Sequence, residues 1–92
     1  MAEQVDRRLW VVGLNLAPGQ VHHWVQDGQT YGKVRWFLAW PLRLSGVGRA
    51  VRIEEVFTRV RENGQFRIEV IVRNIGDTYA NYAIWVAQTT GP

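Results

Sequence analysis

The sequence predicts an all-β fold, a single small antiparallel β-sandwich of about six to seven strands. The first observation is the pair Asn63-Gly64, which lies between two alternating apolar and polar segments and is a strong short-range signal for a β-hairpin. The second is the regular spacing of further strand-like segments, with no stretch that keeps the period of a helix. The third is strict alternation after the turn, where one apolar face is formed by Phe66, Ile68, Val70 and Val72.

Length and composition place the chain among single-domain globular proteins. With 92 residues, of which 47% are hydrophobic, it is expected to form one domain over residues 1–92. The absence of cysteine excludes disulfides and thiolate metal sites, and it favours the cytoplasm over a secreted setting. No stretch resembles a signal peptide and no apolar run reaches about 18 residues, so no membrane span is expected.

Six strands are expected in chain order. Each is bounded by turn residues or by a change in the alternation of apolar side chains. The first ends at a turn that contains Pro18 and Gly19, and a polar loop follows the second. The expected strands cover residues 9–14, 21–26, 33–40, 50–61, 66–74 and 81–88.

Two irregularities are predicted in the middle of the chain. Pro41 ends the third strand because proline has no amide hydrogen to donate to a neighbouring strand, and a loop over residues 42–48 follows. In the fourth strand the apolar positions change parity near Glu54-Glu55. A β-bulge at that point would restore one apolar face to the strand.

The stretch from Phe66 to Val86 resembles the hairpin of CARDB-type immunoglobulin-like domains. It reads Phe-Arg-Ile-Glu-Val-Ile-Val-Arg-Asn-Ile-Gly, then a short loop, then Ala-Asn-Tyr-Ala-Ile-Trp-Val, and it covers about a quarter of the chain. The resemblance implies an immunoglobulin-like sandwich in which Asn74 and Gly76 shape the corner between strand and loop. It also implies an accessory binding or adhesive module with no catalytic residues to carry over.

The charge pattern indicates a solvated sheet face. The net charge is +3, and Lys33 is the only lysine among eleven basic residues. Arginine suits bidentate contact with carboxylate or phosphate, and composition drift in a GC-rich genome produces the same excess. In the second half of the chain the arginines alternate with acidic residues instead of clustering, as expected for cross-strand ion pairs. The pattern therefore does not predict a surface for a polyanion.

Three strands carry more apolar residues than one face of a sandwich requires. The first strand is apolar on both faces. In the third strand, Phe37 and Ala39 lie on one face, and larger apolar side chains that include Trp36 lie on the other. Trp10 and Trp36 are expected in the core, whereas Trp85 is expected to point outward between two alanines.

An additional apolar face predicts self-association into a homo-oligomer, because a contiguous exposed apolar patch marks an interaction surface. The alternatives are that loops cover this face or that the sandwich closes into a barrel. The interface residues predicted from the sequence are Phe37, Ile71, Ala83, Trp85 and Ala87.

The sequence does not predict an enzyme, a metal site or a cofactor. Ser45 lacks the pattern of a nucleophile elbow. His22 and His23 are adjacent, so on a strand they point to opposite faces and cannot hold one metal together. One of them is expected beside Val21 and Val25, and the other on the opposite face with Trp24.

Carbohydrate is the leading ligand class, because a lectin site combines an aromatic platform with planar polar side chains that bind sugar hydroxyls. A purely structural or assembly role is the alternative. The candidate ligand-binding residues are His22, Trp24, Asp27, Gln29, Tyr31 and Trp40.

Single-stranded nucleic acid is a third and less favoured ligand. The stretch Tyr31 to Phe37 resembles the opening strand of cold-shock domains, whose aromatic side chains stack on bases. The second nucleic-acid motif of that family is absent here. The sequence therefore predicts a non-catalytic binding module that self-associates.

Overall fold

A computed structural model of the chain describes residues 4–29, 34–42 and 49–90. Within this part the chain forms six strands, and no helix is present that is long and apolar enough to cross a membrane. The expected loop over 42–48 and the start of the expected third strand fall largely outside the described residues. The strands are β1 (Gln4–Leu16), β2 (Val21–Gln29), β3 (Arg35–Pro41), β4 (Val51–Val60), β5 (Phe66–Asn74) and β6 (Ala80–Thr90).

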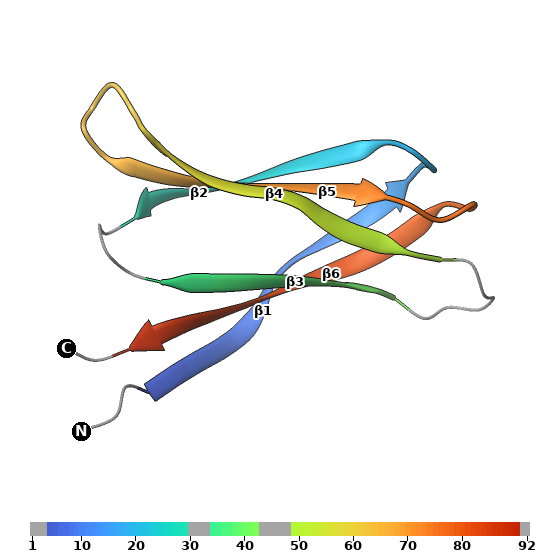
Figure 1. Cartoon of the computed structure of the whole chain (residues 1–92), viewed down its shortest axis with the longest axis horizontal. Helices are drawn as coiled ribbons and strands as arrows, with labels where there is room; N and C mark the ends of the chain where they lie inside the picture. The colour runs from blue at the N-terminus through green and yellow to red at the C-terminus, as the bar shows by residue number, and fades with distance from the viewer. Residues whose placement is uncertain (1–3, 30–33, 43–48, 91–92) are drawn as a thin grey trace.

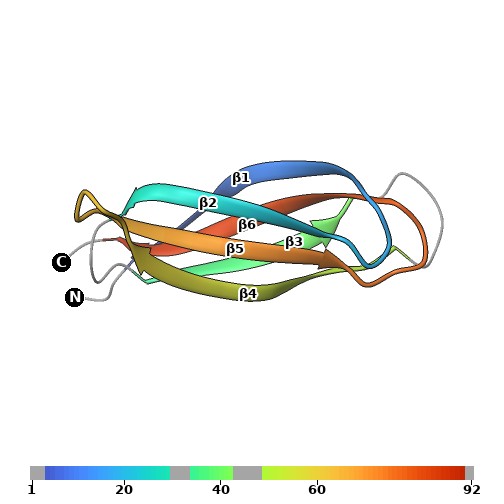
Figure 2. The same ribbon diagram turned by 90° about the horizontal axis from the view of Figure 1, so that it is seen from above.

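The six strands form two three-stranded antiparallel sheets, which confirms the prediction of a small all-β sandwich. One sheet has the order β1-β6-β3 and the other β2-β5-β4. Figure 1 shows the two sheets edge-on, one above the other, and Figure 2 shows the same layers from above. Because each sheet is only three strands wide, the shortest extent between Cα atoms is 15 Å. Each sheet therefore has one middle strand and two edge strands.

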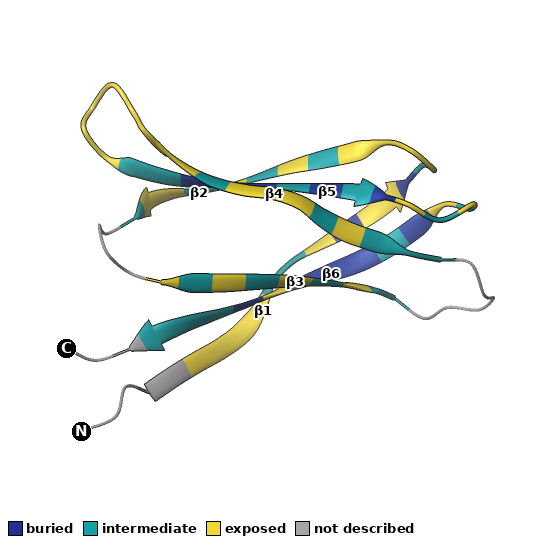
Figure 3. Ribbon diagram, in the orientation of Figure 1, coloured by how far each residue is buried: buried dark blue, intermediate teal, exposed yellow. Residues whose placement is uncertain are grey.

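The core lies between the two middle strands, β5 and β6, where buried positions concentrate (Figure 3). This confirms the predicted inward face of both strands. Their alternation places every second side chain against the opposite sheet. The buried core cluster consists of Leu16, Ile68, Val70, Val72, Tyr82 and Ile84.

Bulges explain two of the sequence irregularities. The register of β4 against β5 shifts between Ile53 and Glu55, which confirms the predicted bulge. A second shift, in β1 between Leu9 and Val11, was not predicted. It lets the consecutive residues Trp10 and Val11 both pack against the core, so β1 is apolar on both parities for a local structural reason.

The predicted hairpin joins β4 to β5 through a type I turn followed by a glycine. The amide of Gly64 donates to the carbonyl of Arg61 at 2.9 Å, and the amide of Arg61 donates to the carbonyl of Gln65 at 2.8 Å. Gly64 has φ of 81°, a left-handed conformation that a residue without Cβ adopts at little cost. The Asn-Gly pair thus fixes the register of the two strands.

Two strands present the face opposite to the one that the sequence favoured. Trp36 was expected in the core but is half exposed, while Phe37 and Ala39 of the same strand pack against the core. The reason lies at the start of β3, where Arg35 points inward at the open end of the sandwich. There its Nη1 donates to Oε1 of Gln26 at 2.6 Å, and burial lowers the pKa of this guanidinium. Because the charged Arg35 lies on the inward face of β3, the sequence pattern predicted the wrong face of this strand as the inward one.

The facing of β2 is also opposite to expectation. His22 and Trp24 point inward, whereas Val21 and Val25 are exposed together with His23. The physical reason is the buried hydroxyl of Tyr82, which both inward side chains contact. A buried hydroxyl requires hydrogen-bond partners, and His22 and Trp24 supply them.

Candidate functional site

The outer face of the β1-β6-β3 sheet is the candidate functional site. Residues directly opposite each other in an antiparallel sheet point to the same side, so the register defines three rows across the three strands. We call this surface the tryptophan face. Its rows, in the order β1, β6, β3, are Val12, Ala83, Trp40; Leu9, Trp85, Leu38; and Arg7, Ala87, Trp36.

The three tryptophans of this face leave a large fraction of their surface in water. Relative exposure is 51% for Trp36, 56% for Trp40 and 44% for Trp85. Leu9 and Leu38 flank Trp85 in the middle row and are exposed to a similar degree. Large apolar side chains are usually found inside a protein, and a contiguous exposed group of them marks an interaction surface.

The face is shallowly hollowed between its tryptophans. A hollow of about 500 Å³ is lined by the three indoles and Leu38, with Arg7 at its margin. The hollow lies over β3 and β6. Ala87 of β6 is paired with Trp36 on one side and Arg7 on the other, and its small side chain leaves space between them. Along β6, the large side chain of Trp85 therefore stands beside a hollow on its Ala87 side, and the small residue Ala83 lies on its other side.

Aromatic side chains that point into the sandwich pack beneath the tryptophan face. Trp10 contacts both Phe37 and Trp24, with ring centroids 5.6 and 6.3 Å apart. Tyr82 is fully buried, and its hydroxyl accepts a hydrogen bond from Nε1 of Trp24 at 2.7 Å and lies 2.6 Å from Nδ1 of His22. The aromatic side chains that face inward thus join the two sheets, whereas the outward tryptophans remain about half exposed among the described residues.

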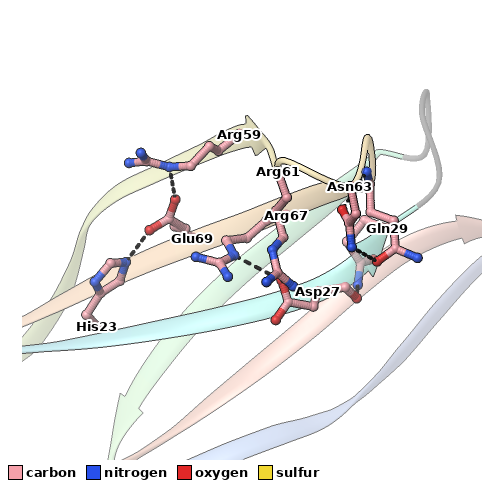
Figure 4. Close-up of polar contacts among 9 residues, drawn as sticks. His23, Asp27, Gln29, Arg59, Arg61, Asn63, Arg67 and Glu69 are labelled. Atoms are coloured by element: carbon pink, nitrogen blue, oxygen red, sulfur yellow. Dashed lines mark hydrogen bonds and ion pairs between the residues drawn. The ribbon is translucent and has the colours of Figure 1, made fainter.

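The outer face of the β2-β5-β4 sheet has the opposite character and is called the charged face. Glu69 is only 3% exposed, and its two carboxylate oxygens lie 2.6 Å from Nε of Arg59 and 2.7 Å from Nε2 of His23 (Figure 4). Asp27 bridges Arg67 at 2.9 Å and Arg61 at 3.2 Å. These cross-strand pairs confirm the predicted charged sheet face.

The arginines of the charged face lower the pKa values of the carboxylates that they contact. For Asp27 the main cause is the hydrogen bond from Arg67. For Glu54 it is the hydrogen bond from Arg73, which is bidentate. Burial alone would raise the pKa of Glu69, but the hydrogen bonds and charges of its two partners outweigh burial, so this pKa is also lowered.

The six residues predicted to bind a ligand do not form one site. His22 and Trp24 point into the sandwich, Asp27 belongs to the charged face, and Trp40 belongs to the tryptophan face. Gln29 ends β2, where its Nε2 donates to the carbonyl of Asp27 at 2.8 Å. Tyr31 lies outside the described residues.

The five predicted interface residues are also divided. Ala83, Trp85 and Ala87 lie together on β6 in the tryptophan face. Ile71 lies opposite His23 on the charged face of the other sheet, and Phe37 packs against the core. The predicted interface residues therefore include the middle strand of the tryptophan face, β6, but none of its residues on the edge strands β1 and β3.

Trp36, Leu38 and Leu9 are among the residues of the face that the sequence did not assign to a site. The signal that could have found them is their position, since each is paired across strands with Trp85 or with Ala87. Strand order, which a single sequence does not contain, is needed to use that signal.

The part of the chain described by the structure has no group of three histidine, aspartate or glutamate side chains placed to hold a metal ion. No protein-family model, curated protein or solved structure matches the chain. The candidate site therefore rests on the geometry of the molecule itself.

Proposed function

We propose that this protein is a non-catalytic binding module that engages its partner through the tryptophan face. The observation that carries the proposal is the division between the two outer faces. One face satisfies its charges with cross-strand ion pairs, and the other exposes three half-buried indoles and neighbouring aliphatic side chains. A partner that covers the second face would remove apolar surface from water, which is the main driving force of protein association.

The chemistry of the face favours an apolar or aromatic partner. Of the nine positions in its three rows, eight are apolar and only Arg7 is charged. Arg7 stands at a corner, opposite Ala87. Tryptophan is one of the residue types that most often dominate the energy of an interface, so Trp36, Trp40 and Trp85 are the expected anchors.

The immunoglobulin-like type, and with it the CARDB-type resemblance, belongs to this proposal. A supporting observation is that the consecutive strands β2 and β3 lie in different sheets, where β2 pairs with β5 and β3 pairs with β6. Asn74 and Gly76 also support it, because the amide of Gly76 donates to Oδ1 of Asn74 at 2.8 Å at the end of β5. Such a sandwich serves as a scaffold, and its function depends on the surface that it presents.

Retention on a phenyl-substituted resin at low protein concentration tests the proposed surface. Leu38→Arg places a charge in the middle row, and Val25→Arg is the matched control because Val25 is 38% exposed on the opposite sheet. We expect the wild type and Val25→Arg to be retained and Leu38→Arg to elute early. Equal retention of all three folded proteins would contradict the proposal.

Carbohydrate binding is a second candidate function, supported by the exposed indoles of Trp36 and Trp40, whose flat faces suit the CH face of a sugar ring. The polar partners expected for sugar hydroxyls point away from these rings: Asp27 pairs with arginines on the other sheet and His22 contacts Tyr82. A glycan array tests this function, with Trp36→Ala as the site variant. Binding that is absent from the wild type, or unchanged in Trp36→Ala, would exclude a sugar on this face.

A further inference from the structure

We propose that the partner of the tryptophan face is a second copy of this chain, docked face to face about a twofold axis. The inference rests on the proposed function and names the partner of that surface. The resulting dimer would be a four-layer sandwich, with the two tryptophan faces inside and the two charged faces in water. Sheets pack in this way at a separation of about 10 Å when their facing side chains interdigitate.

The area of the face reaches the low end of what a dimer requires. The three indoles are about half exposed and together leave about 300 Å² in water, taking about 200 Å² for a whole tryptophan side chain. The exposed parts of Leu9, Leu38 and Val12 bring the total to about 500 Å² per copy. Two copies would then bury at most about 1,000 Å², which is at the lower limit for a specific interface, so a weak dimer that forms as concentration rises is expected.

The relief of the face is self-complementary. Trp85 is a large side chain between two small ones, Ala83 and Ala87, on the outward face of β6. A twofold axis that lies in the interface, crosses the strands and passes between two rows would place Trp85 of each copy over an alanine of the other. Every contact then occurs twice, as an isologous interface requires.

Charge selects one of the two possible axes. An axis between the Trp85 row and the Ala87 row would bring Arg7 of each copy over Leu9 of the other. An axis between the Trp85 row and the Ala83 row leaves Arg7 at the rim, where its guanidinium stays in water. Because an unpaired buried charge is costly, the second axis is favoured. It places Leu9 of one copy over Val12 of the other.

Molar mass as a function of concentration tests the dimer. By light scattering after size exclusion, we expect the wild type and Val25→Arg to move from 10.6 kDa toward twice that mass as concentration rises, and Leu38→Arg to stay at 10.6 kDa. A wild type that remains monomeric up to millimolar concentration would overturn the inference. If phenyl-resin retention still depended on Leu38 in that case, the binding-module proposal would stand and only the second copy would be excluded.

Cysteine crosslinking tests the axis, since the chain has no cysteine of its own. Val12→Cys lies one row from the favoured axis and Arg7→Cys lies on the far side of Trp85, while both are exposed on β1. With a short bismaleimide we expect a covalent dimer from Val12→Cys and little from Arg7→Cys. Val25→Cys, on the charged face, is the control and should give none. A dimer that crosslinks through Val25→Cys, or through Arg7→Cys in preference to Val12→Cys, would overturn this arrangement.

Discussion

At the residue scale, the hydroxyl of Tyr82 connects the two sheets at the centre of the core. Its oxygen accepts a hydrogen bond from Nε1 of Trp24, so its own proton is available for Nδ1 of His22 when that nitrogen carries none. Burial raises the pKa of Tyr82, although the hydrogen bond from Trp24 opposes this effect. The hydroxyl is therefore held in its neutral form between two side chains of β2.

Replacing Tyr82 with phenylalanine removes the oxygen and leaves the ring in place. We expect the free energy of unfolding to fall by about 1–3 kcal/mol, because the indole and imidazole nitrogens lose their shared buried partner. Urea unfolding at pH 7 measures the change. Tyr79→Phe is the matched control, since Tyr79 is 60% exposed. An equal effect of both substitutions would show that the buried hydroxyl has no special role.

The same tyrosine explains a glycine. A Cβ at Gly13 would collide with the ring and hydroxyl of Tyr82, so β1 must have a residue without a side chain at this position. Gly13 lies opposite Tyr82 in the register of β1 and β6, and it is buried. Glycine is often found in a strand where another group approaches the backbone closely, and this is such a place.

At the element scale, Asn74 holds together the corner that ends β5. Its side chain is 1% exposed, and its Nδ2 donates to the carbonyls of Leu16 and Thr78, both at 2.8 Å. Its Oδ1 accepts from the amide of Gly76. One side chain thus connects the end of β1, the end of β5 and the loop before β6.

Asn74→Asp keeps the shape of this side chain but replaces the amide donor with an acceptor. We expect a loss of about 2 kcal/mol or more in unfolding free energy at pH 7, because the carbonyls of Leu16 and Thr78 lose a donor and face a carboxylate instead. Thermal unfolding followed by circular dichroism measures it. Asn63→Asp is the control: Oδ1 of Asn63 accepts from the amide of Gln65 in an exposed turn, and a carboxylate can do the same. Comparable losses in the two variants would contradict the assignment.

The elements show which features a sequence can predict. The hairpin at Gly64 and the bulge near Glu54 follow from local patterns, because turn geometry and strand alternation are local properties. The corner position of Asn74 was expected only from the family resemblance of this stretch, and its hydrogen bonds agree with it. The facing of β3 was not predictable in this way. Its inward face carries Arg35, whose Nη1 donates to Oε1 of Gln26 on a strand of the other sheet, a contact that local sequence does not reveal.

At the scale of the whole molecule, the two sheets share one core and differ in their outer faces. Strand alternation predicted that apolar surface would be left over, and Trp85 was correctly expected to point outward. It did not predict which residues surround Trp85, because Leu9 and Leu38 are brought beside it by pairings between strands distant in sequence. The candidate site is therefore a product of topology, whereas the charged face follows from the alternation of arginine with acidic residues.

Acid should destabilise the molecule through the charged face. The pKa values of Asp27, Glu54 and Glu69 are all lowered in the folded state, from ordinary values of 3.8 for aspartate and 4.5 for glutamate. Such groups contribute stability that is complete above the unfolded pKa and is lost as pH falls through the folded pKa. We therefore expect the melting temperature to decrease between pH 5 and pH 2, beginning near the ordinary glutamate value.

Glu69→Gln should reduce this acid dependence, because glutamine cannot be protonated and Arg59 and His23 lose their shared carboxylate. The variant should be less stable than the wild type at pH 6, and the difference should shrink as the pH falls through the lowered pKa of Glu69 and the wild-type carboxyl becomes protonated. Melting temperatures at half-unit intervals of pH measure both effects. Glu62→Gln, in the exposed β4–β5 turn, serves as the control and should follow the wild-type curve. A constant difference between Glu69→Gln and the wild type at every pH would mean that Glu69 contributes through packing alone, and not through its charge.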